Sequence, residues 1–188
     1  MILIIDCGSQ KTPFIEQMVD EFCDYETIGI HNFTPAILTN FKAVIISGAP
    51  ILITEIDTAP YLKQLECLLN IQLPILGICF GHQLIGLLHG AYPSKMKEDR
   101  DWQLIEIYES CPLFDKLPSE FEIMEDHCET ISIPAGFQLV ASSDACINEC
   151  MQHHTKPIYG VQFHPEVSGN FGRIIFENFI KLASPIKT

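Results

Sequence analysis

Short apolar runs alternate with longer amphipathic segments through the first half of the chain, and this alternation restricts the fold more than any other feature. The runs at 2–6, 27–30, 43–46 and 74–78 have the length and apolar character of strands buried on both faces. Helical spacing marks the segments between them, at 12–22, from 34 onward, at 59–69 and at 81–88. Thr12 and Pro13 are expected to supply the N-cap and first residue of a helix carrying Phe14, Met18, Val19 and Phe22. This order predicts a parallel sheet covered by helices.

The pattern changes near Trp102, where apolar residues begin to recur at every second position. Segments at 102–107, 121–124 and 137–140, separated by turn residues, indicate antiparallel or mixed strands. A late strand at 158–163 leads to His164, and the spacing over 171–182 predicts a closing helix. We therefore predict an α/β fold with an open, mostly parallel sheet flanked by helices and a mixed or antiparallel C-terminal part.

Length and charge restrict the class of protein. A chain of 188 residues fits one domain, spanning 1–188, with a sizeable core. Its net charge of −13 would repel a phosphate backbone, so nucleic acid is not an expected partner. The N-terminal segment 1–6 lacks the basic start of a secretory signal, and no apolar run approaches the roughly 20 residues that a membrane span needs. We expect a cytoplasmic protein without a membrane partner.

The eight cysteines are scattered along a chain without secretory features, so we expect reduced and mostly buried thiols rather than a disulfide framework. Cys146 and Cys150, with His153 and His154 close behind, offer a cysteine- and histidine-rich segment. It contains no Cys-x-x-Cys pair, and its histidines are adjacent rather than spaced as ligands. No metal is therefore expected.

Cys79 lies in the sequence Gly77-Ile78-Cys79-Phe80-Gly81, between an apolar strand and a helix. Small residues on both sides of the turn are typical of a nucleophile elbow. The N-terminus of the following helix would favour the reactive thiolate. Taken alone, the residue fits a buried space-filling cysteine equally well.

The motif His164-Pro165-Glu166 shifts this balance toward a nucleophile. On an extended segment, residues two positions apart leave the backbone on the same face, so Glu166 is expected to orient His164 as the base. The alternative is a surface histidine beside a carboxylate. An acyl-transfer site also needs backbone N–H donors for the developing oxyanion. We expect them from Phe80 and, in the turn before Pro50, from Gly48 or Ala49.

These motifs resemble those of the class I, triad-type glutamine amidotransferases, which have a flavodoxin-like fold. The resemblance runs from Asp6-Cys7-Gly8-Ser9-Gln10 to Gln162-Phe163-His164-Pro165-Glu166. It is greatest to the glutaminase subunits of GMP synthetases, in the two-subunit form typical of archaea. It implies that Cys79 forms a γ-glutamyl thioester from L-glutamine. It further implies substrate contacts from Gln83, Asp126, His127 and Cys128.

For this half-reaction the resemblance implies no metal or organic cofactor. ATP and Mg²⁺ would act on a partner synthetase that aminates xanthosine monophosphate (XMP) to GMP in purine biosynthesis. Two alternatives stay open: a free-standing γ-glutamyl hydrolase or an amidotransferase for another acceptor, and a non-catalytic regulatory or scaffolding domain.

Several positions depart from the family pattern. Ala49 replaces a second glycine and would be strained by about 1 kcal/mol if its φ had to be positive. Cys128 and Glu129 replace the residues expected after His127, which suggests an altered contact loop toward the synthetase. These departures put GMP synthesis in more doubt than glutamine hydrolysis. With the Ala49 turn misaligned until the partner docks, the isolated chain is expected to hydrolyse glutamine poorly.

Overall fold

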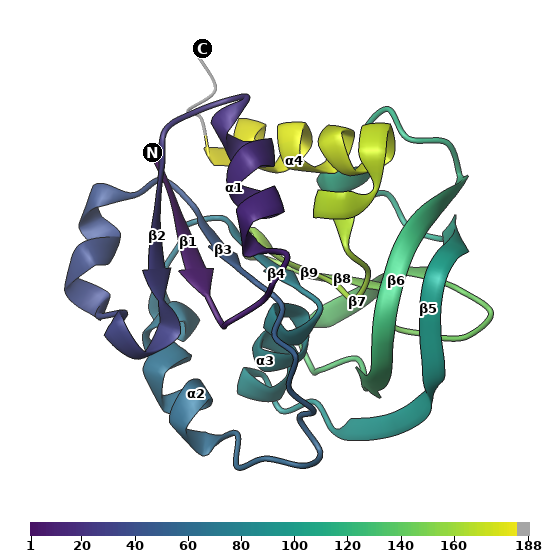
Figure 1. Ribbon diagram of the computed structural model, residues 1–188, viewed down its shortest axis with the longest axis horizontal. Helices are drawn as coiled ribbons and strands as arrows, with labels where there is room; N and C mark the ends of the chain where they lie inside the picture. The colour runs from purple at the N-terminus through teal and green to yellow at the C-terminus, as the bar shows by residue number, and fades with distance from the viewer. Residues whose placement is uncertain (184–188) are drawn as a thin grey trace.

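The computed structural model describes residues 1–183, which form one nine-stranded sheet with helices on both faces (Figure 1). Across the sheet the strands follow the order β2-β1-β3-β4-β9-β8-β7-β5-β6. Their bounds are β1 (Ile2–Asp6), β2 (Tyr25–Gly29), β3 (Val44–Ile46), β4 (Ile75–Ile78), β5 (Pro93–Ile107), β6 (Glu120–Ile131), β7 (Phe137–Ser142), β8 (Cys150–His153) and β9 (Ile158–Val161).

The longer helices are α1 (Thr12–Asp20), α2 (Ala59–Leu65), α3 (Phe80–Leu88) and α4 (Gly169–Ala183). Short 3₁₀ segments are η1 (Ile30–Asn32), η2 (Pro35–Asn40), η3 (Glu66–Asn70), η4 (Pro112–Phe114) and η5 (Pro165–Val167). In residues 1–183, no helix has both the length and the apolar character needed to cross a bilayer.

The sheet has a parallel half and an antiparallel half, as the sequence predicts. Strands β2, β1, β3, β4 and β9 run parallel to one another, and the pairs from β9 through β8, β7 and β5 to β6 are antiparallel. Successive residues of β1 alternate between two cores: Ile2 and Ile4 pack with α1 and α4, and Leu3 and Ile5 pack with α2 and α3. Burial on both faces explains why these strands are apolar throughout.

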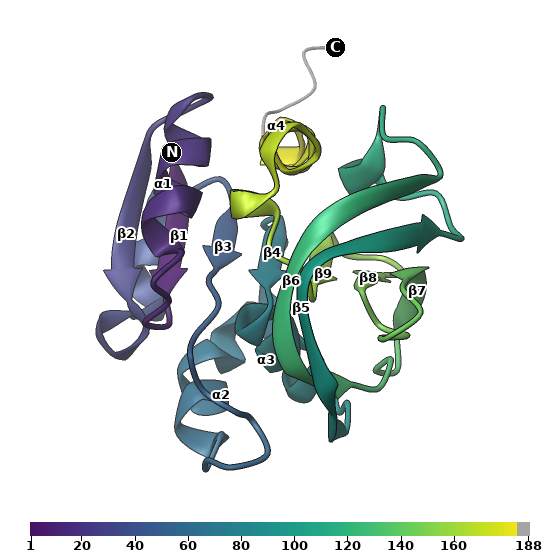
Figure 2. The same ribbon diagram turned by 45° about the vertical axis from the view of Figure 1, so that its right-hand side comes forward.

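The β5–β6 ribbon curves back toward the parallel half of the sheet (Figure 2). The backbone N–H of His164, just beyond β9, donates to the carbonyl of Met124 in β6 at 2.9 Å. The N–H of Met124 in turn donates to the Ser168 hydroxyl at 3.0 Å. The edge strand β6 is therefore held against the segment that follows β9.

Several local predictions were wrong. The N-cap of α1 is Lys11, because the Thr12 hydroxyl donates to the Asp6 carboxylate at 2.6 Å instead of capping the helix. Phe14 is exposed, since the buried face of α1 carries Ile15 and Val19. The segment 59–69 divides into α2 and η3, strands β5 and β6 extend well beyond their predicted bounds, and β8 was not anticipated.

Gly81 permits the close approach of α3 to β3, and its replacement by alanine should destabilise the fold. A Cβ atom at this position would lie 2.3 Å from the carbonyl oxygen of Ile46, so backbone must move. We expect Gly81→Ala to lower the free energy of unfolding by about 1–3 kcal/mol in urea denaturation. Gly29→Ala is the matched control, because its Cβ would meet only one atom, at 3.9 Å. Equal stability of the two variants would contradict this account.

Candidate active site

Three adjacent parallel strands bring the predicted motifs together. The turn 47–50 follows β3, Cys79 follows β4, and His164 follows β9 after a short connection. The carboxyl ends of neighbouring parallel strands meet at one edge of the sheet, where open α/β folds bind their ligands. Strand β4 lies between β3 and β9, so Cys79 has the other two motifs on either side.

Cys79 has the backbone of a strained nucleophile elbow. Its φ of 52° and ψ of −106° lie outside the regions that non-glycine residues ordinarily adopt. Such a turn requires strand and helix to approach closely, and a Cβ on Gly77 would lie 2.5 Å from the carbonyl oxygen of Gly81. The sharp turn directs the cysteine side chain toward the ligand edge at the start of α3.

His164 and Glu166 form a buried pair next to the cysteine. The Nδ1 atom of His164 lies 2.8 Å from Oε1 of Glu166, and the two residues are 3% and 2% exposed. A carboxylate only accepts hydrogen bonds, so Nδ1–H donates and Nε2 is left for Cys79. The expected extended segment was wrong: Pro165–Val167 is the 3₁₀ turn η5, which nevertheless brings the carboxylate back to the ring.

The protonation of His164 follows from its surroundings. Burial lowers its pKa, but the Cys79 sulfur and the Glu166 carboxylate outweigh burial and raise the pKa to about 10. The imidazolium form of His164 is thereby favoured at neutral pH. Sulfur and ring are thus arranged as a nucleophile and a proton donor.

The predicted oxyanion donors surround the cysteine. A Cβ placed on Gly48 would lie 3.6 Å from the Cβ of Cys79 and 3.5 Å from Cε1 of His164, so this glycine borders both groups. Phe80 is the first residue of α3, where backbone N–H groups have no partner within the helix. Ala49 is not among the residues with positive φ, so the condition for strain at this alanine is not met.

Hydrogen bonds accepted by Asp6 and Ser47 connect the segment after β1 to the turn after β3. Its Oδ1 accepts the Gly8 N–H at 2.9 Å and the Ser47 hydroxyl at 3.4 Å. The Ser47 oxygen also accepts the Cys7 N–H at 2.9 Å. The Asp-Cys-Gly-Ser opening of the chain therefore supports the turn that carries Gly48.

A cavity of about 280 Å³ opens above these groups. Its lining includes most of the predicted site residues: Ala49, Cys79, Phe80, Gln83, Asp126, His127, Cys128 and His164. Gly48 and Glu166 are not part of the lining, although both are next to residues that are. Far-separated segments of the sequence thus converge on one cleft.

The four residues expected to contact substrate are placed differently from one another. The Gln83 amide is buried and donates to the Glu129 carbonyl and to the Gln162 side chain. The His127 ring, with its side chain 2% exposed, is directed inward. Asp126 and Cys128 are more exposed and lie at the cleft.

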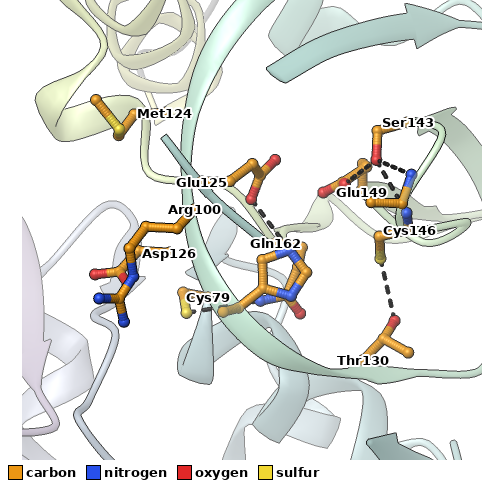
Figure 3. A network of polar contacts seen from close by, with 12 residues as sticks. Cys79, Arg100, Met124, Glu125, Asp126, Thr130, Ser143, Cys146, Glu149 and Gln162 are labelled. Carbon is orange, nitrogen blue, oxygen red and sulfur yellow. Dashed lines mark hydrogen bonds and ion pairs between the residues drawn. The ribbon is translucent and has the colours of Figure 1, made fainter. Parts of the chain in front are cut away.

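Three residues of the site were not singled out from the sequence. Gln162 directs its amide toward the Cys79 sulfur at 3.6 Å (Figure 3). Its place in the motif before His164 was the available signal. Lys11 and Arg100 reach Asp126 from distant segments, with N–O distances of 2.6 and 3.1 Å. Nothing in the local sequence of either cation reveals this convergence.

Glu129 has a structural role that the sequence did not suggest. Its carboxylate accepts hydrogen bonds from the backbone and hydroxyl of Thr54, and the residue is 2% exposed. This buried side chain connects β6 to the loop before α2 and does not form an outward contact surface. The neighbouring residue, Cys128, lines the cleft.

Comparison with protein families and curated sequences gives consistent matches. The family model for Glutamine amidotransferase class-I matches residues 3–182. A relative from Methanocaldococcus jannaschii, named as one of the subunits of GMP synthase (glutamine-hydrolyzing), is 38% identical over 190 residues, covering 97% of each chain. The corresponding protein of Pyrococcus abyssi, which has the same name, is 37% identical over 195 residues, covering 99% of this chain and all of that one.

Solved structures share the fold. A protein from Thermoplasma acidophilum, provisionally assigned as one of the GMP synthase subunits, superposes with a TM-score of 0.89 at 33% identity, covering 97% of this chain and 92% of that one. A glutamine amidotransferase from Thermotoga maritima superposes with a TM-score of 0.77 at 19% identity, covering 96% and 83%.

Proposed function

Because this chain belongs to the class I glutamine amidotransferase family, we propose that it hydrolyses L-glutamine through Cys79 and delivers the ammonia to a separate ATP-dependent synthetase. The observation that carries this proposal is the strained Cys79 beside the buried His164–Glu166 pair, at the floor of a cleft. We further propose XMP as the acceptor of the ammonia.

The first half of the proposed reaction forms a thioester. The Cys79 thiolate attacks the side-chain carbonyl carbon of glutamine, and the carbonyl oxygen takes up negative charge. The N–H groups of Phe80 and of Gly48 or Ala49 stabilise that charge as hydrogen-bond donors. His164 then gives its Nε2 proton to the departing nitrogen, so ammonia leaves and a γ-glutamyl thioester remains.

The second half uses the same groups in reverse. His164, now neutral, removes a proton from a water molecule, whose oxygen attacks the thioester carbonyl. The tetrahedral intermediate collapses, glutamate leaves, and Cys79 is regenerated as a thiolate beside imidazolium. Glutamine and water are consumed, and glutamate and ammonia are produced. No metal or organic cofactor takes part in these steps.

The names of the relatives support the choice of acceptor. Relatives named as subunits of the glutamine-hydrolyzing GMP synthase match almost the whole chain at 37–38% identity. In this proposal the partner synthetase binds ATP, Mg²⁺ and XMP, and it covers the cleft so that ammonia is not protonated in bulk water. Asp126, Lys11 and Arg100 form a charged cluster at the cleft that such a partner could contact.

Reconstitution with a synthetase tests the proposal. We expect the isolated chain to release glutamate slowly, and expect release to rise when the synthetase, ATP, Mg²⁺ and XMP are added together. Stoichiometric formation of GMP and glutamate would support the acceptor. Fast glutamate release that no synthetase changes would contradict coupling, and preferential cleavage of γ-glutamyl peptides would instead support a free-standing hydrolase. Failure of a glutamine-derived electrophile to label Cys79, even with the partner present, would indicate a non-catalytic domain.

A further inference from the structure

The inner face of β6 carries polar residues where a core would require apolar ones. Alternate residues of this strand are buried, beginning with Phe121 and Ile123 and ending with Ile131. Between them the same face holds Glu125 and His127, which are 0% and 8% exposed. Burying ionisable side chains is costly unless they are paired or bind a metal. Glu125 and His127 contact each other at 3.2 Å, and the remaining polar atoms require further partners inside the protein.

Further buried polar groups, which contact these β6 residues, come from the connection between β7 and β8. The side chains of Cys146 and Glu149, 3% and 0% exposed, face the β6 residues (Figure 3). One ligand atom each from His127, Cys146 and Glu149 lies within 4.8 Å of the other two. The carboxyl group of Glu125 is close enough to that of Glu149 to interact with it electrostatically. Two segments that are distant in the sequence thus form one buried cluster.

Several possible ligand atoms of this cluster have no hydrogen-bond partner. His127 Nδ1 lies 3.0 Å from the Glu129 carbonyl oxygen, which can only accept, so Nδ1 donates its proton there and Nε2 is the ring atom that faces the cluster. Among residues 1–183, this Nε2, both carboxyl oxygens of Glu125 and Oε2 of Glu149 have no hydrogen-bond partner, and Nε2 lies in an ion-pair contact with Oε2 of Glu125 at 3.2 Å. A histidine whose second nitrogen donates to a backbone carbonyl is the usual arrangement of a metal ligand.

We propose that His127, Cys146 and Glu149 bind one Zn²⁺ ion, with Glu125 as the fourth ligand. Imidazole nitrogen, thiolate sulfur and carboxylate oxygen are the ligands that zinc takes in proteins. Oε2 of Glu125 lies 3.2 Å from Nε2 of His127. Two ligand atoms about 2.0–2.1 Å from one tetrahedral ion are separated by about 3.3–3.4 Å, so this pair already has the spacing of neighbouring ligands.

Neighbouring groups support the ligand side chains. The Ser143 hydroxyl donates to Oε1 of Glu149 at 2.7 Å, and the Thr130 hydroxyl lies 3.2 Å from the Cys146 sulfur. Outer-shell hydrogen bonds of this kind orient metal ligands. With four protein ligands and no open position, the ion would have a structural role.

The position of the ion suggests what it stabilises. It would connect β6 to the β7–β8 connection, closing the curved antiparallel half of the sheet. The backbone of Glu149 accepts the Gln162 N–H at 2.8 Å, and Met124, next to Glu125, accepts the N–H of His164. An ion at this position would stabilise the backbone segments that carry Gln162 and His164, without contacting substrate.

A proton shared between Glu125 and Glu149 is the competing explanation for the cluster. With His127 paired to Glu125 at 3.2 Å it would account for three of the four groups, but it would leave the Cys146 sulfur without an ion. A zinc ion engages all four groups at once. The two explanations differ in metal content and in the spectrum of a substituted metal.

Metal analysis of the full chain distinguishes them. After removal of metal with a chelator and dialysis against Zn²⁺, we expect one tightly held zinc per chain. Replacement by Co²⁺ should give the intense absorption of a tetrahedral site together with a thiolate-to-cobalt charge-transfer band. Absence of stoichiometric metal, or a cobalt spectrum without thiolate absorption, would overturn the proposal and leave the shared proton.

Variants locate the ion. Cys146→Ser and Glu149→Gln keep the side-chain shape and should weaken zinc binding by more than the roughly 10- to 100-fold that loss of an outer-shell partner costs. Cys79→Ser should retain the ion, because its sulfur is not a ligand, and circular dichroism verifies that each variant is folded. Retention by folded Cys146→Ser, or loss in Cys79→Ser, would place the metal elsewhere and overturn the proposal. If Cys146→Ser does not fold, zinc binding by Glu149→Gln and the cobalt spectrum of the unaltered chain test the proposal instead.

Discussion

Replacing Cys79 with alanine is expected to abolish glutamine-dependent amination in the reconstituted two-component enzyme, while ammonia-dependent amination continues at its original rate. The proposed chemistry requires a sulfur that becomes covalently attached to the glutamyl group, and alanine offers no nucleophile. Glutamate release should fall by at least about 10³-fold, as when the nucleophile of a triad is removed. Parallel assays of GMP formation with glutamine and with ammonium salts measure both rates.

Cys67→Ala is the matched control for this experiment. Cys67 is a half-buried thiol in η3 that does not line the cleft, so its removal should leave both rates close to those of the unaltered enzyme. Loss of both activities in Cys79→Ala would mean that the substitution disrupts the complex. Retained glutamine-dependent activity would mean that a different residue is the nucleophile.

The parallel half of the fold was predictable because its sequence signals are local. A strand buried on both faces must be apolar at successive positions, and this pattern identified β1, β3 and β4 close to their observed bounds. The motif positions followed from topology, since Cys79 and His164 come after neighbouring parallel strands. Strand ends and residue chemistry therefore sufficed to propose the triad, whereas the substrate contacts at Gln83, Asp126, His127 and Cys128 were implied only by the family resemblance.

The antiparallel half was harder to predict because its core is partly polar. Strand β6 buries Glu125, His127 and Glu129 at alternate positions, so the apolar alternation stops after Ile123 although the strand continues to Ile131. The side chains that contact these buried polar groups come from segments distant in the sequence. No local pattern contains that information.

The same limit applied to the proposed zinc site. The expectation of no metal rested on the spacing of cysteines and histidines within 146–154. The cluster in the structure takes Cys146 and Glu149 from that segment but His127 from β6. Metal ligands that come from separate segments of the chain do not produce a recognisable spacing in the sequence. Such a site can therefore be identified only from the folded structure.

Removing the charge of Glu166 should reduce glutamine hydrolysis strongly even though the nucleophile is intact. In Glu166→Gln the shape of the side chain is kept, but the carboxylate that accepts the Nδ1–H of His164 at 2.8 Å is lost. The amide can present its NH₂ group to the ring and favour the wrong tautomer. A comparable loss in other triads lowers kcat by roughly 10²- to 10⁴-fold, and we expect a decrease in this range with a smaller change in KM.

The pH profile separates this electrostatic role from a merely structural one. Burial lowers the pKa of His164, and the charges of Cys79 and Glu166 raise it to about 10. Without the Glu166 charge the pKa must fall, so His164 loses its proton at a lower pH. The alkaline limb of the rate profile, where imidazolium is lost, should therefore move to lower pH. The half-buried Glu177 on α4, which is not part of the site, provides the control: Glu177→Gln should leave the profile in place. A uniform loss of rate with an unshifted profile would mean that Glu166 acts only through packing.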